Sequence, residues 1–262
     1  MSPRTRPGLS AQAASGDTGT MTLDGKVVLV TGGARRLGRE TALALARAGA
    51  DVVVHYRNSA QDARATRDAI RALGRRSHCA RADLARADDI ARLFDQVIDA
   101  MGRIDVLVNN AALFGRGGFF DWSEQEWDTF MDVNLKAPFL CAQHAARLFP
   151  HGKGRIVNIA DVGGIVPWKG YEPYCVSKAG LIMLTKCLAK TLAPGVLVNA
   201  VAPGPVLLPE GADDEERRRA VERTVLGREG SASEVAEAVR YLVESDYVTG
   251  TVLVVDGGRL LA

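Results

Sequence analysis

The sequence predicts an α/β fold, a single domain with a doubly wound parallel sheet of about seven strands and helices on both faces. Two observations predict it. Short apolar runs alternate with longer helical segments along most of the chain, and the apolar runs are continuous rather than alternating with polar residues. Continuous apolar strands are expected where helices cover both faces of a sheet. In such a sheet, ligands bind beyond the carboxyl ends of the strands.

The first half of the chain predicts three strand–helix units and a fourth strand. Segment 26–30 is a short apolar run with β-branched residues that ends in a glycine turn, which is typical of a buried strand. Segment 37–48 is rich in Ala and Leu and is followed by Gly49, which is typical of a helix with a glycine stop. The same signals recur in strand 52–56, helix 60–73 before Gly74, strand 76–80, helix 88–101 before Gly102, and strand 104–108.

The second half continues the alternation. Segment 124–149 carries two helical patterns, and it is followed by strand 155–159, helix 174–192, strand 196–200, helix 233–244 and strand 252–255. The charged run 213–219 is expected to be a solvated helix face on a lid over the site. Because no repeat or Pro/Ser linker divides residues 21–262, they are expected to form one domain. Residues 1–20 predict a disordered tail. A transit peptide is the alternative, and Met21 is an alternative start.

Composition excludes several classes of protein. Hydrophobic residues make up 47% and charged residues 24% of the 262 residues, which is typical of a globular chain. The 33 basic and 31 acidic residues nearly balance, which argues against a nucleic-acid or membrane partner. No apolar run is long enough to span a membrane. The 4 cysteines are scattered and lack C-x-x-C spacing, so we expect no metal site, reduced thiols and a cytoplasmic location.

The turn after the first strand predicts a dinucleotide site. Its glycines permit a sharp turn close to a pyrophosphate, and the next helix offers free N–H groups. The alternative is a purely structural turn. The expected cofactor contacts here are Gly32, Arg35, Arg36, Leu37 and Gly38.

The end of the second strand predicts the cofactor NADPH. An NAD site usually has a carboxylate there for the ribose 2′-hydroxyl, but this chain has Tyr56, Arg57, Asn58 and Ser59. A guanidinium suits a 2′-phosphate, although Arg57 as a solvated loop residue is the alternative. Further contacts are expected where the third and fourth strands end, from Asp83, Leu84, Asn110, Ala111 and Ala112.

Tyr174 and Lys178 are spaced i, i+4 and therefore share one face of a helix. A neighbouring ammonium stabilises a phenolate, so Lys178 is expected to lower the pKa of Tyr174 and make it a general acid. An ordinary surface pair is the alternative.

Together these motifs resemble the short-chain dehydrogenase/reductase family over residues 22–262. The resemblance implies a Rossmann-type subunit, in a homotetramer or a dimer. It implies Tyr174 as proton donor, Lys178 as ligand of the nicotinamide ribose, and Asn134 as holder of a relay water. Pro203, Gly204 and Val206 would lie at the carboxamide. The family's usual Thr is replaced by Leu208.

Two departures from the family pattern, and one further match, resemble the pteridine reductases and dihydromonapterin or dihydrofolate reductases of this family. Asp161 stands where the catalytic Ser is usual, and Arg36 replaces the second glycine of the turn. Phe114 matches an aromatic residue that stacks a pterin. His55-Tyr56 and segment 256–259 also resemble this subgroup. The expected substrate contacts are Arg36, Phe114, Asp161, Trp168 and Tyr174.

Each of these residues has a simpler alternative. Asp161 as a loop residue, Phe114 as a core aromatic and Arg36 as a ligand of cofactor phosphates alone remain open. Trp168, like Tyr171, either lines the substrate mouth or only packs.

The resemblance implies NADPH-dependent reduction of a pterin C=N bond. The alternative enzyme is a carbonyl reductase, acting on a 3-oxoacyl carrier protein or a ketone, although it lacks its usual Ser at position 161. A non-catalytic NADPH-binding regulator is a third class, disfavoured by the presence of Asn134, Tyr174 and Lys178 together.

Overall fold

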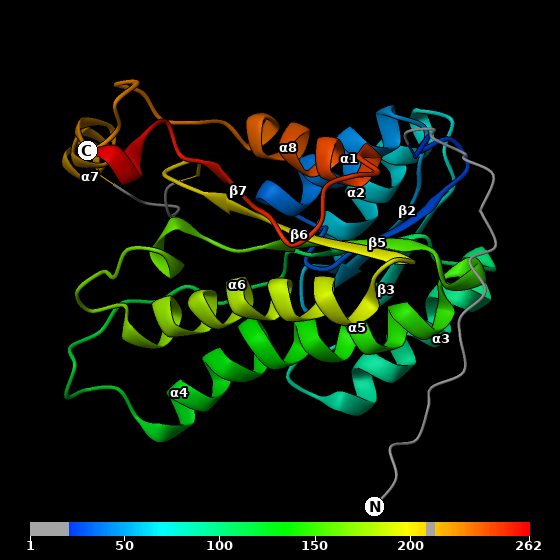
Figure 1. The fold of residues 1–262 in the computed structure, drawn as a ribbon, viewed down its shortest axis with the longest axis horizontal. Coiled ribbons are helices and arrows are strands. Elements are labelled where there is room, and N and C mark those ends of the chain that lie inside the picture. The colour runs from blue at the N-terminus through cyan, green and yellow to red at the C-terminus, as the bar shows by residue number, and fades with distance from the viewer. Residues whose placement is uncertain (1–20, 208–212) are drawn as a thin grey trace, which may run out of the picture.

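A seven-stranded parallel sheet, with strand order β3-β2-β1-β4-β5-β6-β7, lies between two layers of helices in the computed structural model (Figure 1). The model describes residues 21–207 and 213–262. The predicted fold class is confirmed. The strands are β1 (Val27–Val30), β2 (Asp51–Tyr56), β3 (Ser77–Arg81), β4 (Val106–Asn109), β5 (Gly154–Ile159), β6 (Val196–Pro203) and β7 (Val252–Val255).

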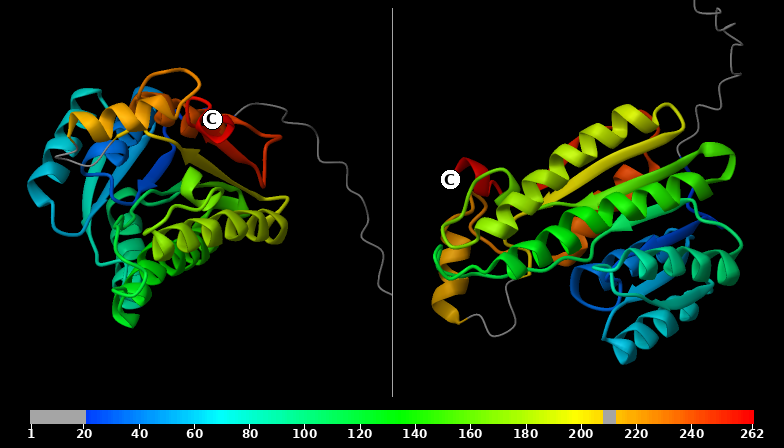
Figure 2. Two further views of the ribbon diagram at one scale, coloured as in Figure 1. Left: turned by 90° about the vertical axis from the view of Figure 1, so that its left-hand side faces the viewer. Right: turned by 90° about the horizontal axis from the view of Figure 1, so that it is seen from below.

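Helices cover both faces of the sheet. One face carries α1, α2 and α8, and the other carries α3, α4, α5 and α6 (Figure 1). Seen from below, α5 and α6 lie side by side over their face (Figure 2). The helices are α1 (Arg36–Arg47), α2 (Ala60–Ala72), α3 (Ala87–Met101), α4 (Glu124–Met131), α5 (Ala137–Leu148), α6 (Glu172–Leu192), α7 (Asp214–Glu222) and α8 (Ala232–Glu244). Short helices are η1 (Asp132–Lys136), η2 (Pro150–Gly152), η3 (Val162–Gly164) and η4 (Arg259–Leu261).

Two hydrophobic cores hold the layers together, one on each face of the sheet. Successive strand residues point to opposite faces. Accordingly Val28 and Val30 pack in the core under α1 and α8, whereas Val27 and Leu29 pack in the core under α3 and α5. All four β1 side chains are fully buried. This two-sided burial explains why the strands are continuously apolar.

The predicted elements agree with the structure apart from their ends and one insertion. Strand β6 continues to Pro203 instead of ending at 200, and the predicted lid helix is α7. The two helical patterns of 124–149 form α4 and α5, but a π-helix, η1, joins them without a break. The predicted tail 1–20 and Leu208 lie outside the described residues.

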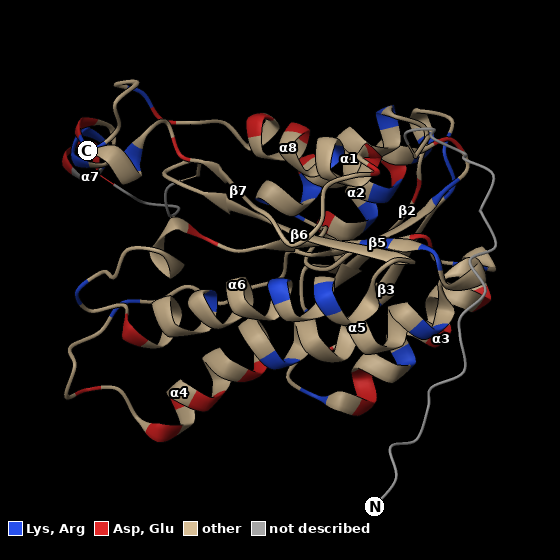
Figure 3. Ribbon diagram, in the orientation of Figure 1, with Lys and Arg blue, Asp and Glu red and all other residues tan. Residues whose placement is uncertain are grey.

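Charge is mixed over the outer surface. Acidic and basic residues are interspersed on the outer helices, whereas the strands are mostly uncharged (Figure 3). Within the described residues no helix is long and apolar enough to cross a membrane. All four cysteines, Cys79, Cys141, Cys175 and Cys187, are free.

Candidate active site

The glycine-rich turn between β1 and α1 is packed so closely that its glycines are required. Gly32 has φ +61°, a conformation that side chains disfavour. A Cβ on Gly38 would collide with the Gly32 carbonyl oxygen and come within 2.6 Å of the Asn110 side-chain nitrogen. The first turn of α1 therefore approaches the strand end closely, which leaves its N–H groups beside the carboxyl edge of the sheet.

Hydrogen bonds from the loop after β4 fix this turn. The Thr31 hydroxyl oxygen accepts from the backbone N–H groups of Asn110 (2.9 Å) and Ala111 (3.0 Å). The Asn110 amide donates to the carbonyl oxygens of Thr31 (2.8 Å) and Gly32 (3.2 Å). Both side-chain N–H groups of Asn110 therefore donate to protein oxygens. Asn110 thus supports the glycine turn.

His55 on β2 fixes the same turn from the other side. Its Nδ1 accepts from the Gly32 N–H at 3.0 Å, and its Nε2 lies 3.2 Å from the Ala82 carbonyl oxygen. These partners require a neutral ring with the proton on Nε2. Burial lowers the pKa of His55 to about 4, against smaller opposing effects of Ala82 and Asp83. His55 was expected only as part of a family resemblance, and its two hydrogen bonds now explain why a histidine stands there.

Arg36 adopts a conformation normally reserved for glycine. Its φ is +51°, one of two such non-glycine residues described. A non-glycine residue in this region costs about 1–3 kcal/mol and is often retained for function. The Arg36 guanidinium donates to the Leu207 carbonyl oxygen at 2.8 Å, across from the loop after β6. Arg36 therefore bridges the two sides of the strand edge where the cofactor and substrate are expected to meet.

A cavity of about 410 Å³ lies where β2 and β3 end. Arg57, Asn58, Arg81, Ala82, Asp83 and Asp89 line it. The two guanidiniums suit a phosphate. The carboxylate of Asp83 accepts from the Ala85 N–H (3.1 Å), and that of Asp89 accepts from the Asp83 N–H (2.9 Å). Arg81 was not predicted as a cofactor residue, although it directly follows the predicted strand 76–80 and is the last residue of β3.

The remaining predicted cofactor residues also follow strand ends. Arg35 lies 3.8 Å from Asp62 of α2, so it is drawn toward that helix. Gly204 leaves no room for a Cβ, which would come within 2.7 Å of Asp256. Leu37 lies in the first turn of α1. The others lie at or just after the ends of β2, β3, β4 or β6 in the described chain: Tyr56, Ser59, Leu84, Ala111, Ala112, Pro203 and Val206.

Tyr174, Asp161 and Lys178 meet where β5 ends and α6 begins. The Tyr174 hydroxyl donates to Asp161 Oδ2 at 2.7 Å, and Asp161 Oδ1 accepts from the Gly163 N–H at 2.7 Å. The Lys178 ammonium donates to the Ile159 carbonyl oxygen at 2.7 Å and lies 5.8 Å from the centroid of the Tyr174 ring. Asp161 therefore contacts the Tyr174 hydroxyl directly, and the solvated-loop alternative is wrong. Likewise, Tyr174 and Lys178 are both buried, so they are no surface pair.

Burial and mutual contact change the acidity of all three groups. Burial, and then the Asp161 charge, raise the pKa of Tyr174 well above its usual value. Burial raises the pKa of Asp161. Burial also lowers the pKa of Lys178 to about 8, although Asp161 opposes this. The expectation that the pKa of Tyr174 is lowered is wrong for this structure, because burial and then the paired Asp161 carboxylate both disfavour the phenolate.

Asn134 lies in the π-helix and is fully buried. Its side-chain oxygen accepts from the Leu113 N–H (2.7 Å), and its nitrogen donates to the Leu113 carbonyl (3.0 Å) and the Ser177 hydroxyl (3.0 Å). With both amide protons used, the side chain holds the loop after β4 against α6. A relay water at Asn134 would therefore find no free N–H on this side chain.

Aromatic rings form one wall beside Tyr174. Phe114 meets the Tyr174 ring edge-on at 4.9 Å, and Trp168 stacks on it at 6.3 Å. Tyr171 contacts both Phe114 (5.3 Å) and Trp168 (5.6 Å). Phe114 is 52% exposed, so it is not a core aromatic. A flat apolar surface is thus open next to the reacting hydroxyl.

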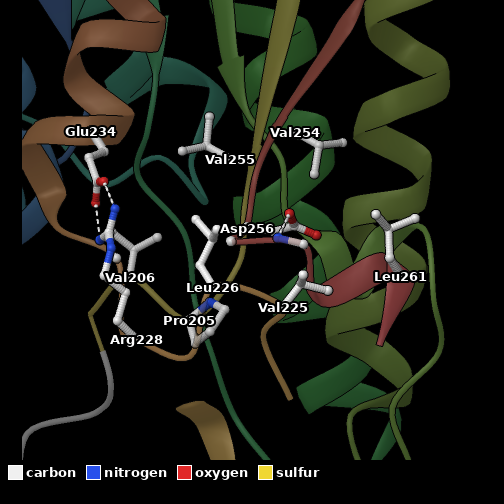
Figure 4. A pocket seen from close by; sticks show the side chains of 13 residues that line it. Pro205, Val206, Val225, Leu226, Arg228, Glu234, Val254, Val255, Asp256 and Leu261 are labelled. Carbon is white, nitrogen blue, oxygen red and sulfur yellow. Dashed lines mark hydrogen bonds and ion pairs between the residues drawn. The ribbon is translucent and has the colours of Figure 1, made fainter. Parts of the chain in front are cut away.

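A second cavity, of about 360 Å³, lies between β7 and the segment after α7 (Figure 4). Among the predicted residues it is lined by Val206, and Tyr174 and Asp161 do not reach it. An ion pair between Arg228 and Glu234 closes one side. Across the described chain, no group of three or more His, Cys, Asp or Glu side chains is placed to hold a metal ion.

Comparison with known proteins agrees with this geometry. The family model described as enoyl-(acyl carrier protein) reductase matches residues 32–259. A 3-oxoacyl acyl-carrier-protein reductase of Staphylococcus aureus is 37% identical over 242 residues, which cover 90% of this chain and 98% of the relative. A 3β-hydroxysteroid dehydrogenase of Eggerthella lenta is 38% identical over 248 residues, covering 91% and 95%.

A solved short-chain dehydrogenase of Burkholderia cenocepacia, in complex with NADP, has a TM-score of 0.85 and is 37% identical. The match covers 92% of this chain and 100% of that one. Identity above 30% over nearly the full length of both chains, together with a shared fold, places them in one family. The chain belongs to the short-chain dehydrogenase/reductase family of oxidoreductases.

Proposed function

We propose that this protein is an NADPH-dependent reductase that acts on a C=N bond of a pterin, converting a dihydropterin or pterin to its tetrahydro form. The observation that carries the proposal is the 2.7 Å hydrogen bond from the Tyr174 hydroxyl to Asp161. When bound, NADPH would supply one hydride for each C=N bond, and the ring nitrogen of that bond would take up a proton. A dihydropterin therefore needs one NADPH and a fully oxidised pterin needs two. Binding, orientation and proton delivery fall to the chain's own residues.

The residues at the strand edge fit NADPH. The glycine turn presents the N-terminus of α1, where an anionic pyrophosphate is stabilised. Arg57 and Arg81 line the adjoining cavity, where a 2′-phosphate would bind. A solved relative of the same fold carries NADP, which supports the choice.

Tyr174 and Asp161 divide the proton chemistry. Because the pKa of Tyr174 is raised, its hydroxyl is protonated at neutral pH and holds a proton to donate, but it is a weaker acid than a free tyrosine. An ionised Asp161 accepts hydrogen bonds and a protonated one donates them. A pterin needs both, because its ring nitrogen takes up a proton while its amino group donates. Phe114 and Trp168 offer the faces on which such a flat heterocycle stacks.

Carbonyl reduction is the second candidate, and the comparisons favour it. The names of the two curated relatives refer to 3-oxoacyl and 3β-hydroxysteroid chemistry, and neither refers to a pterin. Asp161 is the feature against it. A carbonyl oxygen becomes negative in the transition state, and an ionised carboxylate beside Tyr174 would repel that charge.

The variant Asp161→Ser separates the two candidates. We expect it to lower kcat/KM for dihydrobiopterin by about ten- to a thousand-fold, because it removes a positioned proton-transfer group. The same variant is expected to reduce an activated ketone as well as or better than the wild type. Asp95→Ser, at an exposed position on α3, is the matched control.

Two outcomes would overturn the proposal. The first is pterin reduction that survives Asp161→Ser intact. The second is wild-type turnover of acetoacetyl thioesters without turnover of any pterin, which would establish the carbonyl candidate. Assembly as a homotetramer and a cytoplasmic location stay predictions.

A further inference from the structure

The C-terminal segment after β7 brings an arginine into the substrate site. The guanidinium carbon of Arg259, at the start of η4, lies 5.9 Å from the centroid of the Trp168 ring. The same Trp168 ring stacks on Tyr174 at 6.3 Å. Arg259 and the proton donor therefore contact one aromatic side chain. In the views of Figures 1 and 2, the C-terminus lies at the end of the sheet where α6 begins.

Arg259 has no counter-ion in the part of the chain that the structure describes. Its guanidinium makes no hydrogen bond or ion pair with any described residue. The nearest acidic neighbour along the chain, Asp256, accepts from the backbone N–H groups of Gly258 (2.8 Å) and Leu260 (2.9 Å). Asp161, the other carboxylate close enough to interact, is held by Tyr174 and Gly163.

The surroundings of Arg259 favour an added anion. Partial burial, and then the positive charge of Arg223, lower the pKa of Arg259, while the carboxylates of Asp161 and Asp256 oppose this without pairing with it. Arg116 places another guanidinium 5.9 Å from the Tyr171 ring, which belongs to the same aromatic wall. A partly desolvated cation among like charges is unfavourable until an anion pairs with it. Arg259, Arg223 and Arg116 thus add positive charge beside the aromatic wall, and the proposed proton transfer uses none of them.

We propose that Arg259, assisted by Arg223, binds a carboxylate on the side chain of the substrate. The substrate class is then a flat heterocycle that carries an anionic tail, rather than an uncharged pterin. A guanidinium fixed against an aromatic face presents a planar pair of donors, which matches a carboxylate. The inference rests on the proposed function only for the identity of the reducible ring.

The test compares anionic and neutral substrates in matched pairs. The pterin pair is dihydrofolate, which has a carboxylate tail, and dihydrobiopterin, which has none. The ketone pair is acetoacetate and ethyl acetoacetate. Each is assayed by NADPH oxidation with the wild type, Arg259→Met, Arg259→Lys and the control Arg92→Met on the exposed face of α3.

We expect Arg259→Met to lower the ratio of kcat/KM for the anionic over the neutral member by about ten-fold or more, mainly through KM. Arg259→Lys should restore part of that ratio, and Arg92→Met should leave it unchanged. Equal losses for both members of a pair would mean that Arg259 only supports the fold, and an unchanged ratio would mean that it binds no anion. Either result overturns the inference.

Failure of the inference can be told from failure of the proposed function. If pterins are reduced and the ratio is insensitive to Arg259, the inference falls and the proposed function stands. If only ketones are reduced and Arg259→Met lowers their ratio, the proposed function falls and the carboxylate site stands. If none is reduced, equilibrium binding of the same four compounds to the NADP⁺-loaded protein gives the same comparison.

Discussion

Acidification is expected to destabilise this protein through one buried histidine. The folded-state pKa of His55 is about 4, below its usual 6.5. Between these values the unfolded chain binds a proton at position 55 and the folded chain does not, so the free energy of unfolding falls as pH falls. From about pH 7.5 to about pH 5, these two pKa values give a loss of about 2 kcal/mol. Above about pH 7.5 the histidine is neutral in both states and contributes almost no pH dependence.

The assay is urea unfolding of the wild type and His55→Gln at both pH values. Glutamine carries an amide N–H for the Ala82 carbonyl, but it cannot be protonated in this range. Carboxylates contribute equally to both proteins, so they cancel in the difference between the two pH profiles. We expect the wild type to lose about 2 kcal/mol more than the variant on acidification. Parallel profiles would refute the argument that His55 is a neutral, buried clamp on the glycine turn.

Two further predictions concern the cofactor and the acid. Arg57→Ala should weaken NADPH binding by about ten-fold or more and barely change NADH binding, as measured by fluorescence titration; equal losses would show that Arg57 does not contact the 2′-phosphate. Tyr174→Phe should lower kcat by about 10²–10⁴-fold in single-turnover assays while NADPH still binds, because only the proton donor is removed. A variant that retains its rate would transfer the acid role to another group, with Asp161 the first to be tested.

The sequence predicts the strands and their carboxyl ends well because burial on two faces leaves a plain signal. Four fully buried residues in β1 are followed at once by the glycine turn, and strands β2, β4, β5 and β6 are likewise mostly buried. The places of Arg57 after β2 and of Tyr174 on α6 could therefore be predicted from the sequence. Their predicted neighbourhood depends only on strand order and helix periodicity.

Contacts between distant segments could not be predicted in the same way. Arg36 reaches Leu207, and Arg259 reaches Trp168, through loops whose course no periodicity encodes. The π-helix at Asn134 has no compositional signal, since it interrupts two ordinary helical patterns by one wider turn. The expected lowering of the Tyr174 pKa was wrong for a related reason. The i, i+4 spacing placed Lys178 on the same helix face as Tyr174. It could not show that the Tyr174 hydroxyl is hydrogen-bonded to Asp161, on a different segment.

The identity of residue 161 determines the charge balance of the site. Lys178 is 3% exposed, and the negative charge of Asp161 opposes the effect of burial on its pKa. With a serine at position 161, the buried ammonium would be the sole charge among these three groups and would favour an oxyanion. With an aspartate, the two charges offset each other, so a transition state that gains a proton on nitrogen is no longer penalised by a net positive site. We therefore expect a change at this single position to alter the preference between C=O and C=N substrates while the fold and the cofactor turn stay the same.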